Sequence, residues 1–217
     1  MLFRSSATIL GCFNELRVDQ WDRHELSEMA FQAERLYLGV KGGWQDQYAT
    51  VFGGFNFMEF KMDENIVHPL RLHPDILLEL EESLLLCNTG MTHQTGEIHK
   101  DQKSQFENPK VKNFVKKNVN LSYKIRNQLL RGNLNSFGKS LDEAWHLKKL
   151  LSDKISNNFI DEIYLGSKNN GALGGKLLGA GGGGFFLFYV PPFKKHSLIN
   201  FLESLNLEVR QFRFESQ

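Results

Sequence analysis

The sequence lacks most of the features that would assign it to a specialised class of protein. Its 217 residues include only two cysteines, Cys12 and Cys87, at no metal-binding or redox spacing, which excludes a disulfide framework and a zinc site. The 26 basic residues nearly balance the 25 acidic residues, and a formal charge of +1 gives no general attraction to nucleic acid or to an anionic membrane. The longest apolar runs, such as residues 185–190, are far shorter than the ~20 residues of a membrane span.

The N-terminus also lacks the apolar stretch of a secretory signal peptide, because the first four residues lead directly into polar Ser5 and Ser6. These absences predict a cytoplasmic protein of mixed helices and strands, with no nucleic-acid or membrane partner. The nineteen glycines are the feature that composition does not explain, since several of them lie in tight clusters.

Apolar residues recur at helical spacing along much of the chain. The first predicted helix begins at Ser5 and Ser6, which would cap it. The second covers residues 22–38 and stops at Gly39. Their apolar faces comprise Leu10, Phe13 and Leu16 in the first helix, and Leu26, Met29, Ala30, Ala33 and Tyr37 in the second.

The remaining patterns predict helices that cover one side of a mostly antiparallel sheet. The pattern resets around Pro69 and Pro74, which we interpret as a domain boundary. Strands are predicted at residues 55–60, 83–87, 185–190 and 209–214, the last at a sheet edge, and helices at 95–106, 111–129, 134–151, 159–164 and 194–205.

A glycine run covers residues 179–184 and leads directly into a predicted strand. It lies between apolar pairs rather than among Ser, Pro and charged residues, so we expect another backbone or a ligand to approach it closely. Successive N–H groups there would also favour an anion. A flexible linker or a plain turn is the alternative. The spacing matches neither a Walker loop nor a dinucleotide fingerprint.

Three polar positions are candidates for chemistry, each with a simpler alternative. Asp46 follows a glycine pair and would accept a proton from a substrate hydroxyl, or else bond its own backbone in a turn. Glu34 together with a serine hydroxyl suits magnesium, or else pairs with a neighbouring cation. Ser5 and Ser6 at a helix start would favour phosphate, or else serve only as caps.

In this order the motifs resemble those of the GHMP small-molecule kinases, the superfamily of galactokinase, homoserine kinase, mevalonate kinase and phosphomevalonate kinase. The resemblance spans practically the whole chain. It is strongest toward the bacterial D-glycero-D-manno-heptose 7-phosphate kinases, with fucokinase-like sugar kinases close behind. The motifs that carry it include Gly43-Trp44-Gln45-Asp46-Gln47, Phe52-Gly53-Gly54-Phe55-Asn56, Trp145-His146-Leu147-Lys148-Lys149 and residues 171–184.

The resemblance implies an α+β fold with two domains. Residues 1–68 would be the end of the N-terminal ATP-binding domain, which is ribosomal protein S5 domain 2-like, and residues 69–217 a complete ferredoxin-like C-terminal domain. It also implies transfer of the γ-phosphoryl group of ATP to a sugar or sugar-phosphate hydroxyl, with ATP and Mg²⁺ required. The expected reaction converts D-glycero-D-manno-heptose 7-phosphate to the 1,7-bisphosphate for surface polysaccharide.

The same resemblance implies a role for each site residue. Asp46 would be the catalytic base, and Glu34 and Ser6 would hold magnesium. Ser5, Ser6 and Ala7 would present N–H groups to the phosphates. The residues expected near the sugar are Gln45, Gly53, Gly54, Gly179, Ala180, Gly181 and Gly182.

The sequence departs from the family pattern at three places. Phe3 and Arg4 stand where the phosphate loop has a glycine and a small hydroxyl residue, so we expect the chain to be the C-terminal portion of a longer kinase. His93 stands where relatives often have Arg, and Trp44 where they often have Lys. Without the preceding strands the first two helices would expose apolar faces, which predicts self-association. The alternatives are a catalytically impaired remnant of such a kinase and a glycine-rich interaction module.

Overall fold

The chain folds into two compact units, one ending at Arg71 and the other spanning Leu72–Phe214. The structure is a computed structural model that describes residues 2–39, 42–91, 98, 101, 102, 104, 105 and 107–214, with side chains from Ser6 onward. The change of unit falls near the boundary expected between residues 68 and 69. The assignment of the two parts to kinase domains stays a prediction.

The first unit contains three α-helices, a π-helical turn and a hairpin. Helix α2 begins with a capping box: Asp22 accepts from the Glu25 N–H at 2.8 Å, and the Glu25 carboxylate accepts from the Asp22 N–H at 2.9 Å. The elements are α1 (Leu2–Glu15), α2 (Arg23–Gln32), η1 (Ala33–Tyr37), α3 (Gln45–Phe52), β1 (Asn56–Phe60) and β2 (Asn65–Pro69).

The predicted cap at Ser5 and Ser6 is wrong. Helix α1 already begins at Leu2, so both serines lie inside it rather than at its end. Helical periodicity alone does not fix where a helix starts, and the apolar pair before the serines continues the pattern. The expected apolar face is largely exposed within this unit: Phe13 is 59% and Leu16 83% accessible.

The second helix changes its winding at Ala33. The N–H of Leu38 donates to the carbonyl of Ala33 at 3.2 Å, five residues back, which is the π-helical bond. The wider turn shifts every later side chain around the axis. Tyr37, expected on the apolar face, is 85% exposed. Glu34, which lies in helical phase with the buried Ser27 and Ala30, is 2% exposed. The prediction for Tyr37 is therefore wrong, because it assumed 3.6 residues per turn throughout.

Helix α3 is held against α2 and the hairpin by aromatic packing and one shared carboxylate. Trp44 stacks on Phe31 with ring centroids 4.6 Å apart. Glu28 accepts hydrogen bonds from the Tyr48 hydroxyl and the Asn65 amide, both at 2.7 Å. Burial, with the bond to Glu28, raises the pKa of Tyr48 to about 12. These contacts fix the orientation of the segment that carries Asp46.

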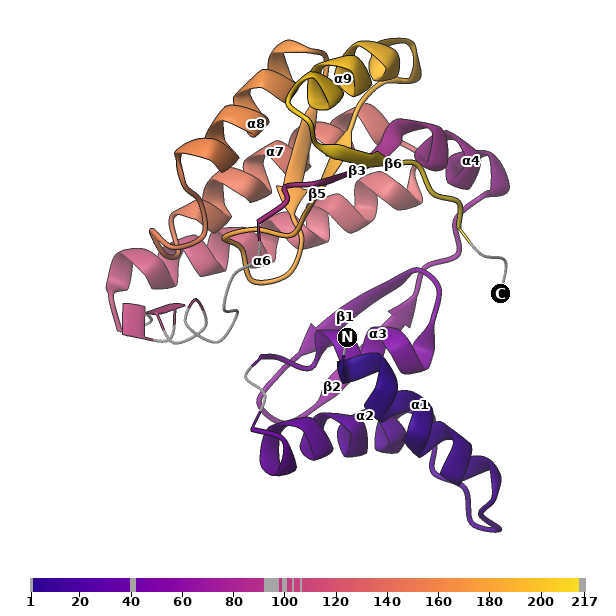
Figure 1. Ribbon diagram of the computed structural model, residues 1–217. Helices are drawn as coiled ribbons and strands as arrows, with labels where there is room; N and C mark the ends of the chain where they lie inside the picture. The colour runs from indigo at the N-terminus through magenta and orange to yellow at the C-terminus, as the bar shows by residue number, and fades with distance from the viewer. Residues whose placement is uncertain are drawn as a thin grey trace. The chain divides into compact units, whose positions relative to one another are not determined.

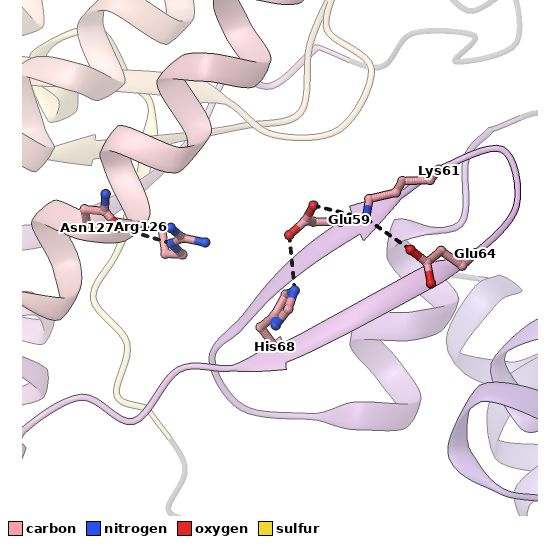
Figure 2. A network of polar contacts seen from close by, with 6 residues as sticks. All are labelled: Glu59, Lys61, Glu64, His68, Arg126 and Asn127. Atoms are coloured by element: carbon pink, nitrogen blue, oxygen red, sulfur yellow. Dashed lines mark hydrogen bonds and ion pairs between the residues drawn. The ribbon is translucent and has the colours of Figure 1, made fainter.

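The hairpin adds an exposed polar layer to this unit. Figure 2 shows Glu59 on β1 reaching the His68 ring on β2 at 3.1 Å, and Lys61 pairing with Glu64 at 3.2 Å near the turn. Cross-strand and turn pairs of this exposed kind contribute less than about 1 kcal/mol each. They support the strand register and leave the packing of the unit to its aromatic residues.

The second unit is a four-stranded antiparallel sheet with helices alongside it (Figure 1). Strand order is β4-β5-β3-β6, which places β6 at an edge, as the sequence predicts. Side chains of three helices and three strands form one core, including Trp145, Tyr164, Leu198, Leu85, Leu177 and Phe186. The elements are α4 (Pro74–Ser83), β3 (Leu84–Asn88), α6 (Pro109–Leu130), α7 (Leu134–Lys149), α8 (Asn158–Asn169), β4 (Gly174–Leu177), β5 (Phe185–Tyr189), α9 (Pro192–Ser204) and β6 (Glu208–Arg210).

Four elements are absent from the sequence prediction: α3, β2, α4 and β4. The predicted edge strand is shorter than expected and ends at Arg210. Of the helix expected at residues 95–106, positions 98, 101, 102, 104 and 105 are helical, and the rest lies outside the described residues, as does His93. In the described part of the chain, no helix combines the length and apolar character that a membrane crossing requires.

Candidate functional site

The buried acid of the first unit is paired with an amide. The Gln47 side-chain N–H₂ on α3 donates to Glu34 Oε2 at 2.7 Å, and both side chains are almost fully buried, at 1% and 2% exposure. The other carboxylate oxygen, Glu34 Oε1, is buried and has no hydrogen-bond partner among the described residues; the same holds for Gln47 Oε1. Buried polar atoms are nearly always satisfied, so two such oxygens in one hydrogen-bonded pair of residues call for a ligand or water.

Asp46 lies one residue before this pair, in the first turn of α3. Its side chain is exposed, as is that of Gln45. The Asp46 backbone carbonyl accepts from the Thr50 hydroxyl at 2.8 Å, whereas its carboxylate has no hydrogen-bond partner in the part of the chain that the structure describes. The turn interpretation, in which Asp46 bonds its own backbone, is therefore not what the structure shows. The carboxylate is accessible to a hydroxyl.

Gly53 and Gly54 end α3 and turn the chain into β1. Both adopt left-handed conformations, with φ of 63° and 65°, and the Gly53 N–H donates to the Ala49 carbonyl at 3.1 Å. Such a turn requires glycine for conformational reasons alone. Their expected place near a sugar stays a prediction.

The serine segment lies in α1. Ala7 is buried at 5% exposure, and Ser6 is half-buried. Inside a helix the N–H groups of Ser6 and Ala7 point to the carbonyls of the preceding turn, so they are not the free donors of a helix start. Phosphate binding by Ser5, Ser6 and Ala7 is therefore a prediction that this conformation of the first turn does not favour.

The residues fit a magnesium site of the kind that keeps most of its waters. Glu34 offers one unpartnered buried oxygen while Gln47 holds the other, and η1 packs against α1, which carries Ser6. Magnesium needs only one or two protein ligands beside phosphate oxygens. Among the described residues no group of three or more His, Cys, Asp or Glu is gathered for a metal.

In the second unit, the glycine loop (residues 178–184) is pressed against two other backbone segments. A Cβ atom at Gly183 would lie 2.6 Å from the Met91 carbonyl oxygen, and one at Gly181 would lie 3.1 Å from Ile155 Cα. Gly181, Gly182 and Gly183 are buried. The close approach of another backbone, predicted from the sequence, is confirmed.

The predicted anion nest is only partly open. The Gly182 N–H donates to the Ile155 carbonyl at 2.8 Å, and the Gly184 N–H donates to the Met91 carbonyl at 3.0 Å. These two groups are therefore committed to the fold. The exposed part of the loop is at its beginning, at Leu178 and Gly179, with Ala180 half-buried. A ligand of this loop would meet its first half.

Sequence reasoning missed two residues at these sites. Gln47 is thirteen positions from Glu34, and no local pattern in the sequence indicates that the two side chains meet. Lys148, in the last turn of α7, is 9% exposed and donates to the carbonyls of Leu177 and Gly179 at 3.0 Å and 2.6 Å. A signal was present for Lys148, since it follows Trp145 by three positions on the apolar face of the helix.

Glu34, Asp46 and Gln47 lie together in the first unit, and Gly53 and Gly54 end the same helix as Asp46. The glycine loop belongs to the second unit. A common cleft formed by Glu34, Asp46 and the loop stays a prediction.

Two family models match the chain. Residues 5–54 match the model described as GHMP kinases N terminal domain, and residues 125–206 match the model described as GHMP kinases C terminal. D-glycero-alpha-D-manno-heptose 7-phosphate kinase of Campylobacter jejuni is 36% identical over 195 residues, which are 89% of this chain and 58% of that protein. L-fucokinase/L-fucose-1-P guanylyltransferase of Bacteroides fragilis is 29% identical over 185 residues, covering 83% of this chain and 19% of that protein.

Among solved structures, a D-glycero-D-manno-heptose 1-phosphate kinase from Bacteroides thetaiotaomicron superposes with a TM-score of 0.71 at 31% identity. The match covers 97% of this chain and 59% of that one. The chain thus spans less than two thirds of the length of each of these relatives. The similarity includes both stretches on which the candidate residues lie.

Proposed function

The chain belongs to the GHMP kinase family, and from that premise we propose that it acts in the ATP-dependent phosphorylation of a sugar hydroxyl. The acceptor we propose is D-glycero-D-manno-heptose 7-phosphate, phosphorylated to the 1,7-bisphosphate. The support is the 36% identity to a kinase named for that substrate. Fucose is the second candidate acceptor, on the weaker similarity to a fucokinase.

The observation that carries the proposal is the arrangement around the start of α3. An accessible carboxylate, Asp46, directly precedes Gln47, which holds the buried Glu34 with one oxygen left without a partner. Phosphoryl transfer depends on positioning and charge stabilisation more than on covalent chemistry, so it needs one group at the hydroxyl and another near the phosphates. The exposed Asp46 suits the position at the hydroxyl, and the buried Glu34 suits the position near the phosphates.

Each acid would act through its own surroundings. Asp46, being solvent-accessible, would orient the attacking hydroxyl and accept its proton. Glu34 would be kept in one rotamer by Gln47 and present Oε1 to magnesium, together with the Ser6 hydroxyl. Magnesium, when bound, supplies neutralisation of the charge on the phosphate oxygens. Gln45, Gly53, Gly54 and residues 179–182 would lie near the sugar.

The test is turnover by the 217-residue chain with ATP, Mg²⁺ and D-glycero-D-manno-heptose 7-phosphate, followed as ADP release and by ³¹P NMR of the product. We expect Asp46→Asn to lower kcat at least ~100-fold, the usual contribution of a positioned general base. Asp63→Asn, an exposed acid in the hairpin turn, is the matched control and should keep full activity.

Activity assays with heptose phosphate and with fucose as acceptors distinguish the proposed function from its alternatives. Turnover of fucose but not of the heptose phosphate would replace the proposed acceptor. If the wild-type chain is folded yet gives no more ADP than Asp46→Asn with any sugar, the impaired remnant is the better description. That outcome would agree with the helical conformation of Ser6 and Ala7, whose N–H groups are turned into α1.

A further inference from the structure

Lys148 is a buried cation with an unusual set of partners. It lies in the last turn of α7, and its ammonium donates to the carbonyl of Leu177, the last residue of β4, and to that of Gly179 in the glycine loop. Within the described residues no carboxylate pairs with it. The neighbouring Lys149, by contrast, forms an ordinary ion pair with Asp161 at 2.8 Å.

Burying an ammonium without a counter-ion is unfavourable. Burial lowers the pKa of Lys148 to about 7, and the nearby charge of Lys176 on β4 adds to this effect. An apolar side chain at this position of the helix would avoid that penalty. The interaction that Lys148 gains in exchange is the pair of bonds to the loop and to the strand that leads into it.

The two ends of the loop are held differently at Gly184 and at Gly179. At the end next to β5, the Thr89 N–H donates to the Gly184 carbonyl at 2.8 Å, and the Gly184 N–H donates to the Met91 carbonyl. At the beginning, the Leu178 N–H donates to the Phe185 carbonyl at 2.8 Å, and the next residue, Gly179, has its carbonyl bound by the Lys148 side chain at 2.6 Å. Gly179 has a left-handed φ of 70° and no atom within 4 Å of an added Cβ, so packing does not hold it. Glycine backbone is the most costly to order.

We propose that Lys148 is a positioning residue for phosphotransfer: it fastens the exposed first half of the glycine loop in the conformation that receives the sugar. The proposal rests on the proposed function, in which residues 179–182 lie near the acceptor. It adds a group that does not touch substrate and acts only through the main chain of the loop.

The test compares Lys148→Met, which keeps the aliphatic stem, with Lys149→Met, which removes the adjacent charge and leaves the loop contact intact. Amide hydrogen exchange is measured on peptides covering residues 177–184, alongside steady-state kinetics with the heptose phosphate. Losing the two hydrogen bonds that Lys148 donates corresponds to a change on the order of tenfold. We expect loop exchange to accelerate by about that factor and KM for the sugar to rise similarly, with exchange in α8 unchanged.

Lys148→Arg keeps a cation with several donors and should restore part of the protection and of the KM. If Lys148→Met gives no folded protein, Lys148→Leu, which also lacks a donor, is measured instead with the same expected result. Unchanged loop exchange, or faster exchange with an unchanged KM, would overturn the proposal. A wild-type chain without turnover would overturn the proposed function, whereas the exchange result would still decide whether Lys148 fastens the loop.

Discussion

The buried ammonium of Lys148 predicts a specific dependence of stability on pH. In an unfolded chain lysine titrates near 10.5, and in the fold the pKa of Lys148 is lowered to about 7. Between these values the unfolded chain holds a proton that the folded chain has released. The free energy of unfolding therefore rises with pH through this window, and the penalty of burying the charge is fully present below pH 7.

The magnitude follows from the width of the window. One proton of difference changes the free energy of unfolding by about 1.4 kcal/mol per pH unit. From pH 7.5 to 9.5 the wild-type protein should gain about 2 kcal/mol from this residue alone. Lys176 faces Lys148 from β4 and also has a pKa lowered by burial, so its titration adds to the total.

The assay is urea unfolding at pH 7.5, 8.5 and 9.5, followed by far-UV circular dichroism. Lys148→Met keeps Lys176 and every other titrating group, so the difference between wild type and variant isolates Lys148. From pH 7.5 to 9.5, the free energy of unfolding of the wild type should increase by about 2 kcal/mol relative to that of Lys148→Met. The free energy of unfolding of Lys149→Met should increase with pH as it does in the wild type, since Lys148 is intact. Parallel curves for wild type and Lys148→Met would refute the reasoning.

Two further predictions concern close packing and the buried acid. Gly183→Ala places a Cβ 2.6 Å from the Met91 carbonyl oxygen and should lower the free energy of unfolding by about 1–3 kcal/mol. In Gly179→Ala the new Cβ meets no atom, so only the left-handed backbone is penalised, by about 1–2 kcal/mol. Equal losses in urea unfolding would contradict the steric argument. Gln47→Leu leaves both oxygens of the buried Glu34 without a protein donor, so we expect the free energy of unfolding to fall by about 1–3 kcal/mol and the magnesium requirement to rise. Gln47→Glu should be less stable still, because it brings two carboxylates together. A Leu variant as stable as the wild type would show that the hydrogen bond does not contribute to stability.

Many of the helices were predictable, because local periodicity and capping residues identify a helix in the sequence. The box at Asp22 and Glu25 marks the start of α2, and the runs that became α6, α7 and α8 repeat apolar residues every three or four positions. Short strands are harder to identify from the sequence. Strand β4 contains two glycines, and β2 ends in a proline, so neither shows an alternating pattern that would identify it.

The site divides in the same way. The accessible position of Asp46 and the close backbone approach at the glycine loop follow from residue type and neighbours, and the structure agrees with both. The burial of Glu34 and its bond to Gln47 do not, because they depend on which segment packs against this part of the helix. The cap at Ser5 failed for a related reason, since the amphipathic pattern gives the face of a helix more reliably than its first residue.

The sequence by itself determined the family, most helices, and which residue types are available for phosphotransfer, since these depend on motifs and on spacing along the chain. Only the tertiary structure decided the environment of each charge. Glu34 is held by an amide thirteen positions away, and Lys148 is bound to carbonyls about thirty positions later in the chain (29 and 31 residues). Burial and partnership depend on contacts between distant segments, and a one-dimensional pattern does not specify which segments meet.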